Sequence, residues 1–245
     1  PPPPPPNFFF HAYQSNRDSV ASRWLGDVYK RQVLDPIANS EAILTQEDKD
    51  GGVCLIDFGA GVTSYSVFQD EGIVRSGVIS KGGDDITQEI AFAFDTSFEE
   101  AKRLKEDYGH AKSSTIKDEQ FIEFVQATNK DSHYLSSLQL SEVIEEAYLE
   151  ILSTLKDELI HHKIAANIKS GFVLCGGAAQ ALGCEELVRE FFTRRVKKGV
   201  VKRNRISGLE TILMDYRYLG SIGLLLYQED KAKEDILKTK EETVI

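Results

Sequence analysis

The feature that most constrains the fold of this chain is a pair of glycine turns, each following an apolar run suited to a β-strand. The first lies in "VCLIDFGAGVTSYSVF", residues 53–68, where strand-like residues flank Gly59 and Gly61 on both sides. The second lies in "GFVLCGGAAQALG", residues 171–183, where Gly176 and Gly177 follow a buried-strand pattern. Two explanations stay open for each turn. Glycine either supplies a backbone conformation that the turn needs, or leaves peptide amides accessible to a ligand.

Strand-like and helix-like patterns alternate from Val33 onward. One helix is predicted from Pro36 to Gly51–Gly52, and another begins near Ala178, just after the second glycine turn. The longest helical pattern starts at Ser136 with capping-box spacing and continues for about seven turns. Further strands are predicted within 72–81, closed by Gly82–Gly83, and over 121–125, and further helices over 84–94, 97–108 and 218–227. This alternation indicates an α/β architecture.

Composition and charge exclude several classes of function. The 245 residues carry a formal charge of −10, which argues against general nucleic-acid binding and against a basic membrane-binding patch. No apolar run approaches the roughly 20 residues that span a bilayer. The three cysteines form no CxxC pair, and the five histidines show no metal-ligand spacing. A reducing compartment with buried thiols is therefore expected.

The first 32 residues differ from the rest of the chain. Six prolines are followed by a segment without helical or strand periodicity, and "DVYKRQ" at Asp27–Gln32 resembles a reading frame of a transposon end used in sequencing libraries. We expect translated adapter sequence joined to a gene near Val33, and leave residues 1–32 out of the fold prediction. The alternative is a proline-rich ligand segment.

The chemistry of the two turns is compatible with a nucleotide. Gly59 and Gly61 lack a Cβ that would keep a phosphate from the backbone amides. Asp57, at the end of its strand, supplies the oxygen ligand that Mg²⁺ prefers. Gly176 and Gly177 would let a nucleoside lie flat against the chain at a helix N-terminus.

Together, about 120 residues apart, the turns resemble the second phosphate loop and the adenosine loop of the actin, Hsp70 and sugar-kinase superfamily. Within it, the chain resembles the bacterial cell-division family FtsA over residues 33–227. The segments that carry this resemblance, in order, are "PIANSEAIL", "IDFGAGVTSYSVF", "GGDDITQEIAFAF", "EEAKRLKEDYG", "LQLSEVIEEAYLEIL", "GFVLCGGAAQALG" and "YLGSIGLLLY".

The resemblance implies the second lobe of an actin-like, ribonuclease H-like fold, with a mixed sheet and flanking helices. Residues 33–81 and 171–227 would form the core of this lobe, and residues 82–170 a smaller inserted α+β subdomain. The tail at 228–245 is charged, and we expect it to be frayed.

The resemblance also assigns roles to individual residues. Around the phosphates it places Asp57, Gly59, Gly61 and Thr63, with Asp57 also on Mg²⁺. A family "GGxxxT" turn corresponds to Gly82, Gly83 and Thr87. It places Gly176 and Gly177 against the adenosine of ATP, and it places Lys105 on the purine side.

Asp35 falls where relatives in the superfamily place the acid that orients the attacking water. The alternative explanation for Asp35 is an ordinary helix N-cap. The phosphate loop departs from the common DxGGGTTD at Ala60, Val62 and Ser64, which weakens the expected binding. Lys102 stands where the family usually has glutamate.

The function implied is that of an ATP-binding, polymerising adaptor that links the tail of the tubulin-like protein FtsZ to the inner face of the cell membrane at the division site. It would be a slow ATPase at most. We expect the first phosphate loop to lie N-terminal to Val33 and the amphipathic membrane helix to be missing here, so that this chain alone binds ATP poorly and is inactive. Two alternatives share the glycine loops: a PilM-like pilus-assembly ATPase, and a sugar or acetate kinase.

Overall fold

The computed structural model describes residues 33–70, 72–128, 130–201, 206 and 215–227. Contacts divide the chain into a unit ending at Val33 and a second unit from Leu34 to Ile245, to which all the elements below belong. The predictions made for residues 1–32 and 228–245 lie outside the described residues. The division into a core lobe and an inserted subdomain stays a prediction.

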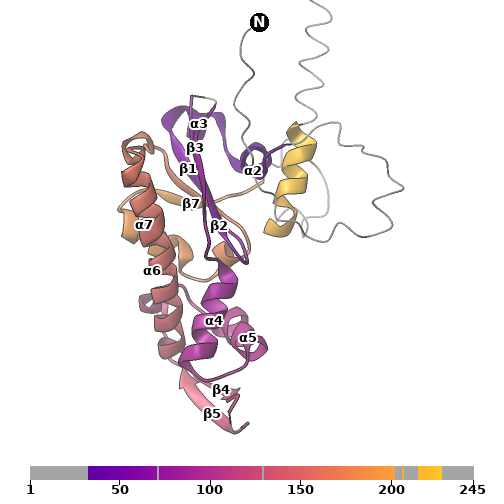
Figure 1. The fold of residues 1–245 in the computed structure, drawn as a ribbon, viewed down its shortest axis with the longest axis vertical. Helices are drawn as coiled ribbons and strands as arrows, with labels where there is room; N and C mark the ends of the chain where they lie inside the picture. Colours follow the sequence, from indigo (N-terminus) through magenta and orange to yellow (C-terminus); the bar gives the residue numbers. More distant parts are fainter. Residues whose placement is uncertain (1–32, 71, 129, 202–205, 207–214, 228–245) are drawn as a thin grey trace, which may run out of the picture. The chain divides into compact units, whose positions relative to one another are not determined.

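A mixed five-stranded sheet in the order β3-β2-β1-β6-β7 organises the second unit (Figure 1). Strand β1 pairs with β2 in antiparallel and with β6 in parallel orientation, while β2–β3 is antiparallel and β6–β7 parallel. The strands are β1 (Val53–Phe58), β2 (Thr63–Gln69), β3 (Gly72–Ile79), β6 (Gly171–Cys175) and β7 (Val196–Lys198). The predicted α/β class with a mixed sheet is confirmed.

Helices cover both faces of this sheet. Figure 1 shows α6 and α7 on one side and α2, with the yellow helix of residues 219–227, on the other. The helices are α2 (Asp35–Ile43), α3 (Gln46–Gly51), α4 (Gly83–Ala93), α5 (Phe98–Tyr108), α6 (Ser137–His161) and α7 (Cys184–Phe192). Short 3₁₀ turns occur at η1 (Ser113–Thr115), η2 (Ala165–Asn167), η3 (Ala178–Gln180) and η4 (Tyr216–Tyr218).

Two apolar clusters form the core, one on each face. Because side chains alternate along a strand, Cys54 and Ile56 of β1 contribute to the cluster with α4, α6 and α7, while Val53 and Leu55 contribute to the other. The second cluster includes Leu219 and Ile222. Burying each such large aliphatic side chain contributes about 1.5–3 kcal/mol, so both faces of the sheet stabilise the unit.

Helix α6 joins the sheet to a hairpin formed by β4 (Phe121–Val125) and β5 (Ser132–Ser136) (Figure 1). Its 25 residues span roughly 37 Å at 1.5 Å per residue. The predicted capping box is confirmed, because Ser136 Oγ accepts from the Gln139 amide at 3.1 Å and Gln139 Oε1 accepts from the Ser136 amide at 3.1 Å. Its buried stripe holds this one helix against α4, α5 and the sheet.

Two predicted helix boundaries are wrong. The helix expected from Pro36 to Gly51–Gly52 breaks at Leu44 and Thr45, because Thr45 forms a capping box with Asp48 and starts a second helix, α3. The helix expected from Ala178 begins only at Cys184, because Gly183 adopts φ +76° just before it. Residues Ala178–Gln180 form a single 3₁₀ turn instead.

No helix in the described ranges is both long enough and apolar enough to cross a membrane.

Candidate functional site

The two glycine turns meet at one edge of the sheet. Asp57 and Cys175 are the last paired residues of the parallel strands β1 and β6, so both chains leave the sheet side by side. A Cβ placed on Gly176 would lie 2.4 Å from Asp57 Oδ1 and 2.4 Å from the Phe58 carbonyl oxygen. In open α/β sheets, ligands bind at such carboxyl ends of parallel strands. The turns predicted from the sequence are therefore neighbours.

The start of α4 joins the same edge. The Gly83 amide donates to the Gly59 carbonyl at 2.9 Å, and the Asp84 amide donates to the Ala60 carbonyl at 2.7 Å. A Cβ on Gly83 would lie 3.4 Å from the Cβ of Ala178. The "GGxxxT" turn thus lies between the two glycine turns and contacts both.

Lys105 of α5 reaches this meeting point. Its Nζ donates to the Gly83 carbonyl at 2.5 Å and to Thr87 Oγ1 at 2.6 Å, while Thr87 Oγ1 donates to the same carbonyl at 3.0 Å. Burial lowers the pKa of Lys105, and the nearby Asp84 opposes this shift. The ammonium group therefore ties α5 to the first turn of α4, at the place where the three loops meet.

Asp57 lines a recess of about 360 Å³. Its Oδ2 accepts a hydrogen bond at 3.0 Å from Nδ2 of Asn39, a residue of α2. Burial raises the pKa of Asp57, the charge of Asp35 raises it further, and the Asn39 hydrogen bond lowers it. The recess is lined by Asp35, Asn39, Asp57, Gly176, Tyr216, Leu219, Gly220, Ser221 and Leu224.

Asp35 lies in the same recess as Asp57, but it is not the N-cap of α2. The N-cap is Leu34, and Asp35 is the first helical residue, next to Pro36. The alternative explanation of Asp35 as an N-cap is therefore wrong. An exposed carboxylate in a first turn still interacts favourably with the helix dipole.

The glycines of the site differ in what surrounds them. A Cβ on Gly59 or Gly82 would come within 2.7 Å or 2.4 Å of a backbone oxygen, so these positions exclude a side chain for reasons of packing. By contrast, no atom lies within 4 Å of a Cβ on Gly61 or Gly177. Packing therefore explains why Gly59 and Gly82 are glycines. It does not explain Gly61 and Gly177, and the space beside these two is open to a ligand.

Thr63 is fully buried at the start of β2, and its Oγ1 has no hydrogen-bond partner among the described residues. A buried hydroxyl without a partner costs free energy that a polar ligand atom can recover. Thr63 lies two residues after Gly61, at the start of β2, so this hydroxyl belongs to the same edge of the sheet.

Two residues of the site were not predicted from the sequence. Asn39, which bonds Asp57, lies four residues after Asp35, and this one-turn spacing on a helix was a signal that could have found it. Tyr148 of α6 donates from its buried hydroxyl to the Ala178 carbonyl at 2.7 Å, and so supports the second glycine turn. Nothing distinguishes Tyr148 in sequence from the other members of the apolar stripe.

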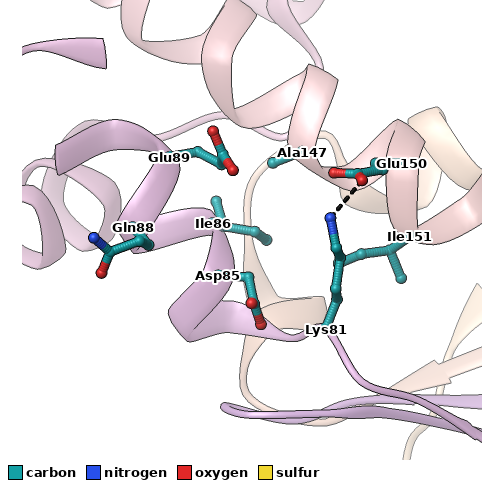
Figure 2. Close-up of a pocket in the computed structure, with 8 residues that line it drawn as sticks. All are labelled: Lys81, Asp85, Ile86, Gln88, Glu89, Ala147, Glu150 and Ile151. Carbon is teal, nitrogen blue, oxygen red and sulfur yellow. Dashed lines mark ion pairs between the residues drawn. The ribbon is translucent and has the colours of Figure 1, made fainter. Parts of the chain in front are cut away.

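A smaller recess of about 70 Å³ lies between α4 and α6, outside the predicted site (Figure 2). Figure 2 shows Ile86 and Glu89 of α4 on the side toward α6, Gln88 pointing away from it, and Lys81 paired to Glu150 of α6. The Glu150 carboxylate raises the pKa of Lys81. This pair links the residues just before α4 to the middle of α6.

The described residues contain no group of three or more His, Cys, Asp or Glu side chains arranged to hold a metal ion.

Comparison with known proteins gives a consistent result. A family model described as "Cell division protein FtsA" matches residues 54–223. The chain is 32% identical over 212 residues to the FtsA protein of Buchnera aphidicola, covering 83% of this chain and 50% of that protein. For Pseudomonas aeruginosa FtsA the values are 30% over 202 residues, 82% and 48%. The chain spans about half the length of the curated relatives it matches.

Solved structures show a similar fold. The crystal structure of MreB5 of Spiroplasma citri bound to ADP aligns with a TM-score of 0.66 at 18% identity, covering 83% of this chain and 61% of that chain. The PilM-PilN type IV pilus biogenesis complex aligns with a TM-score of 0.55 at 17% identity, covering 81% and 52%. These likenesses concern the fold alone, and they confirm the predicted actin-like class.

Proposed function

The chain belongs to the FtsA family of cell-division proteins, and from this premise we propose that it acts as a nucleotide-dependent, actin-like adaptor that polymerises and links FtsZ to the membrane. The observation that carries the nucleotide part is the meeting of three loops at one sheet edge, where the Gly83 amide bonds the Gly59 carbonyl and Gly176 abuts Asp57. Membrane attachment and a cytoplasmic location at the division site are proposed from the family alone.

The residues present fit a nucleotide. The unpartnered Thr63 hydroxyl and the open space at Gly61 suit phosphate oxygens, and the open space at Gly177 suits an adenosine. Asp57 would hold Mg²⁺, which neutralises phosphate charge when bound. Burial and the charge of Asp35 raise the pKa of Asp57, and a bound Mg²⁺ would lower it by favouring the ionised carboxylate. The ADP-bound state of the similar MreB5 protein supports the proposal.

Asp35 is proposed to orient water, since it opens to the recess that Asp57 lines. Asn39 would keep the Asp57 carboxylate oriented and ionised through its hydrogen bond at 3.0 Å. Lys105, bonded to the first turn of α4, would lie on the purine side. Among these residues only Asp35 is proposed to act on the attacking water, and we therefore propose slow hydrolysis at most.

Nucleotide binding is tested by amide NMR of the chain with millimolar ADP and Mg²⁺. We expect shifts in the resonances of residues 59–63 and 176–177. Gly61→Val should weaken binding about tenfold, because its side chain fills open space that a phosphate would use. The matched control is Gly72→Val, where a Cβ would approach its nearest atom only at 3.9 Å, at the start of β3. Equal affinities in both variants would reject the site.

The β4–β5 hairpin is our proposed docking surface for the FtsZ tail, within a subdomain formed by residues 82–170. Its outer face carries Phe121 and Tyr134, which are 77% and 67% exposed, and Val125 beside them. Exposed aromatic side chains gathered on one surface indicate a protein interaction site.

The partner is tested by measuring the affinity of the chain for an FtsZ C-terminal peptide and for a PilN-type peptide. We expect only the first to bind, and the double variant Phe121→Ser, Tyr134→Ser to lose binding about tenfold or more. Val200→Ser, at an exposed apolar residue outside the hairpin, is the control. Retention of the PilN-type peptide would favour the PilM-like alternative.

A further inference from the structure

Strand β3 forms one edge of the five-stranded sheet, and no other described strand pairs with its outer side. Such an edge presents N–H and C=O groups that a strand of another chain can pair with. The side chains of Val74, Ser76 and Val78 are exposed, and the two valines are 48% and 65% accessible. The edge thus combines backbone groups that no described strand pairs with and exposed apolar side chains.

The sequence of β3 is nearly the same in both directions. Residues 73–79 read "IVRSGVI", in which isoleucine, valine and the central Ser76 occupy symmetric positions. In an antiparallel pair of two such strands centred on Ser76, Val74 of each copy faces Val78 of the other. Cross-strand pairs of β-branched residues stabilise such a ladder.

We propose that two copies of this chain associate through β3, antiparallel and centred on Ser76, so that their two sheets become continuous. The pairing is isologous, since the same surface serves both copies and the contact closes on itself. It requires neither nucleotide nor FtsZ, and it therefore stands or falls separately from the proposed function.

The charges of β3 are compatible with this register. Arg75 is the one charged residue of the strand, and its Nη2 lies 2.6 Å from His162 Nε2 on α6. In the pair, Arg75 faces Gly77 of the second copy, so no like charges meet. Gly77 has to remain without a side chain, because a Cβ there would lie 2.5 Å from the Tyr65 ring.

A β-bulge interrupts the β2–β3 register between Val67 and Phe68, where β3 has one additional residue, Val74. Bulges protect edge strands from pairing because they twist the edge away from a partner. Here the regular part of β3 runs from Arg75 to Ile79, so the three central pairs of the proposed ladder lie outside the bulge.

The register is tested by disulfide cross-linking of the full chain. Facing residues of an antiparallel pair have Cα atoms about 4.5–5.5 Å apart, within the range of a disulfide, so Ser76→Cys should form a covalent dimer on mild oxidation. In Val78→Cys the two introduced sulfurs are four residues apart along the strands, roughly 13 Å, and should link at least about tenfold more slowly. The natural cysteines are buried and do not interfere. Equal linking of the two variants, or none in either, overturns the proposal.

A charge exchange provides a second readout by sedimentation equilibrium. In the variant Val74→Lys, Val78→Lys the introduced lysines face each other twice, so the dimer dissociation constant should rise about tenfold. In Val74→Lys, Val78→Glu each lysine faces a glutamate, and the constant should return to within about threefold of the parent. Both positions are exposed, so folding should be unaffected. Identical constants for the two variants would contradict the proposed register.

Discussion

At the scale of single residues, Asp57 shows how a candidate site can oppose the stability of its own fold. Burial and the charge of Asp35 both raise its pKa, and the Asn39 hydrogen bond compensates only in part. A carboxyl whose pKa is raised on folding binds protons more tightly in the folded state than in the unfolded state. Its contribution to stability is therefore present at low pH and lost as the pH rises through the folded-state pKa.

Replacing Asp57 with asparagine should stabilise the chain at pH 7 by roughly 1 kcal/mol, the scale of one stabilising substitution. The neutral amide avoids the cost of ionisation and can still accept from Asn39. Urea unfolding at pH 7 and pH 4 measures this, and the gain should shrink at the lower pH. A gain that grows as the pH falls would show that Asp57 is ionised without cost in the folded chain.

Two glycines that look alike in the sequence, Gly82 and Gly61, should respond differently in stability when each is replaced with alanine. Gly82→Ala should destabilise the chain by about 1–3 kcal/mol, because its Cβ would lie 2.4 Å from the Ala60 carbonyl oxygen. Gly61→Ala should change stability little or raise it by about 0.4–1 kcal/mol, because its Cβ meets nothing and the unfolded chain loses freedom. Thermal unfolding of both variants tests the contrast. Equal losses would mean that the turn at Gly61 also depends on packing.

The sequence could indicate that these glycines matter, but not which of them exclude a side chain through packing. That distinction depends on the Ala60 carbonyl, which lies more than twenty residues from Gly82 in the chain. Lys105 was predicted to face a purine. Its bonds to the Gly83 carbonyl and Thr87 could not be anticipated, because they require the approach of α5 to α4.

At the scale of elements, the strands beside the glycine turns were the easiest to predict, whereas the short strands β5 and β7 were not predicted. The β1 and β2 runs contain β-branched and aromatic residues on both sides of a turn, which leaves little choice. Helix ends were harder. Thr45 divides one expected helix into α2 and α3 through a local capping box, and Gly183 delays the start of α7. Both signals are present in the sequence, but each competes with the apolar pattern that surrounds it.

The N-terminal cap of α6 is an element-scale feature that can be tested alone. Ser136→Ala should cost about 1 kcal/mol, since it removes the acceptor for the Gln139 amide at a buried helix start. Ser153→Ala, on the exposed side of the same helix, should instead gain a few tenths of a kcal/mol, because alanine is the better helix former. Chemical denaturation of both variants provides the comparison. Equal effects would indicate that the cap adds nothing to α6.

At the scale of the whole molecule, the order of strands was beyond local prediction. The parallel pairing of β1 with β6 joins residues more than 110 positions apart, and the intervening segment carries α4, α5, the hairpin and α6. Only the resemblance to a known family, which places residues 33–81 and 171–227 in one lobe, implied that these two segments come together. The pairing of β1 with β6 is also what brings the two glycine turns together, so the candidate site depends on the fold more than on either motif.

The three cysteines allow a test of whether both faces of the sheet unfold together. Cys54 and Cys184 lie in the core cluster with α6, while Cys175 lies in the cluster with residues 219 and 222. All three are buried, and burial raises each thiol pKa, that of Cys184 to about 12. Because thiolate is the reactive form, none should react with a disulfide reagent until the chain opens.

If the unit from Leu34 onward unfolds cooperatively, the three thiols should be labelled at the same rate in native buffer, and this rate should rise with urea along the global unfolding curve. Mass spectrometry of peptides after pulsed labelling separates the three sites. Faster labelling of Cys175 than of Cys54 would show that the face covered by α2 opens first. Since Cys175 directly precedes Gly176 and pairs with Asp57, such opening would expose the candidate site before the rest of the core.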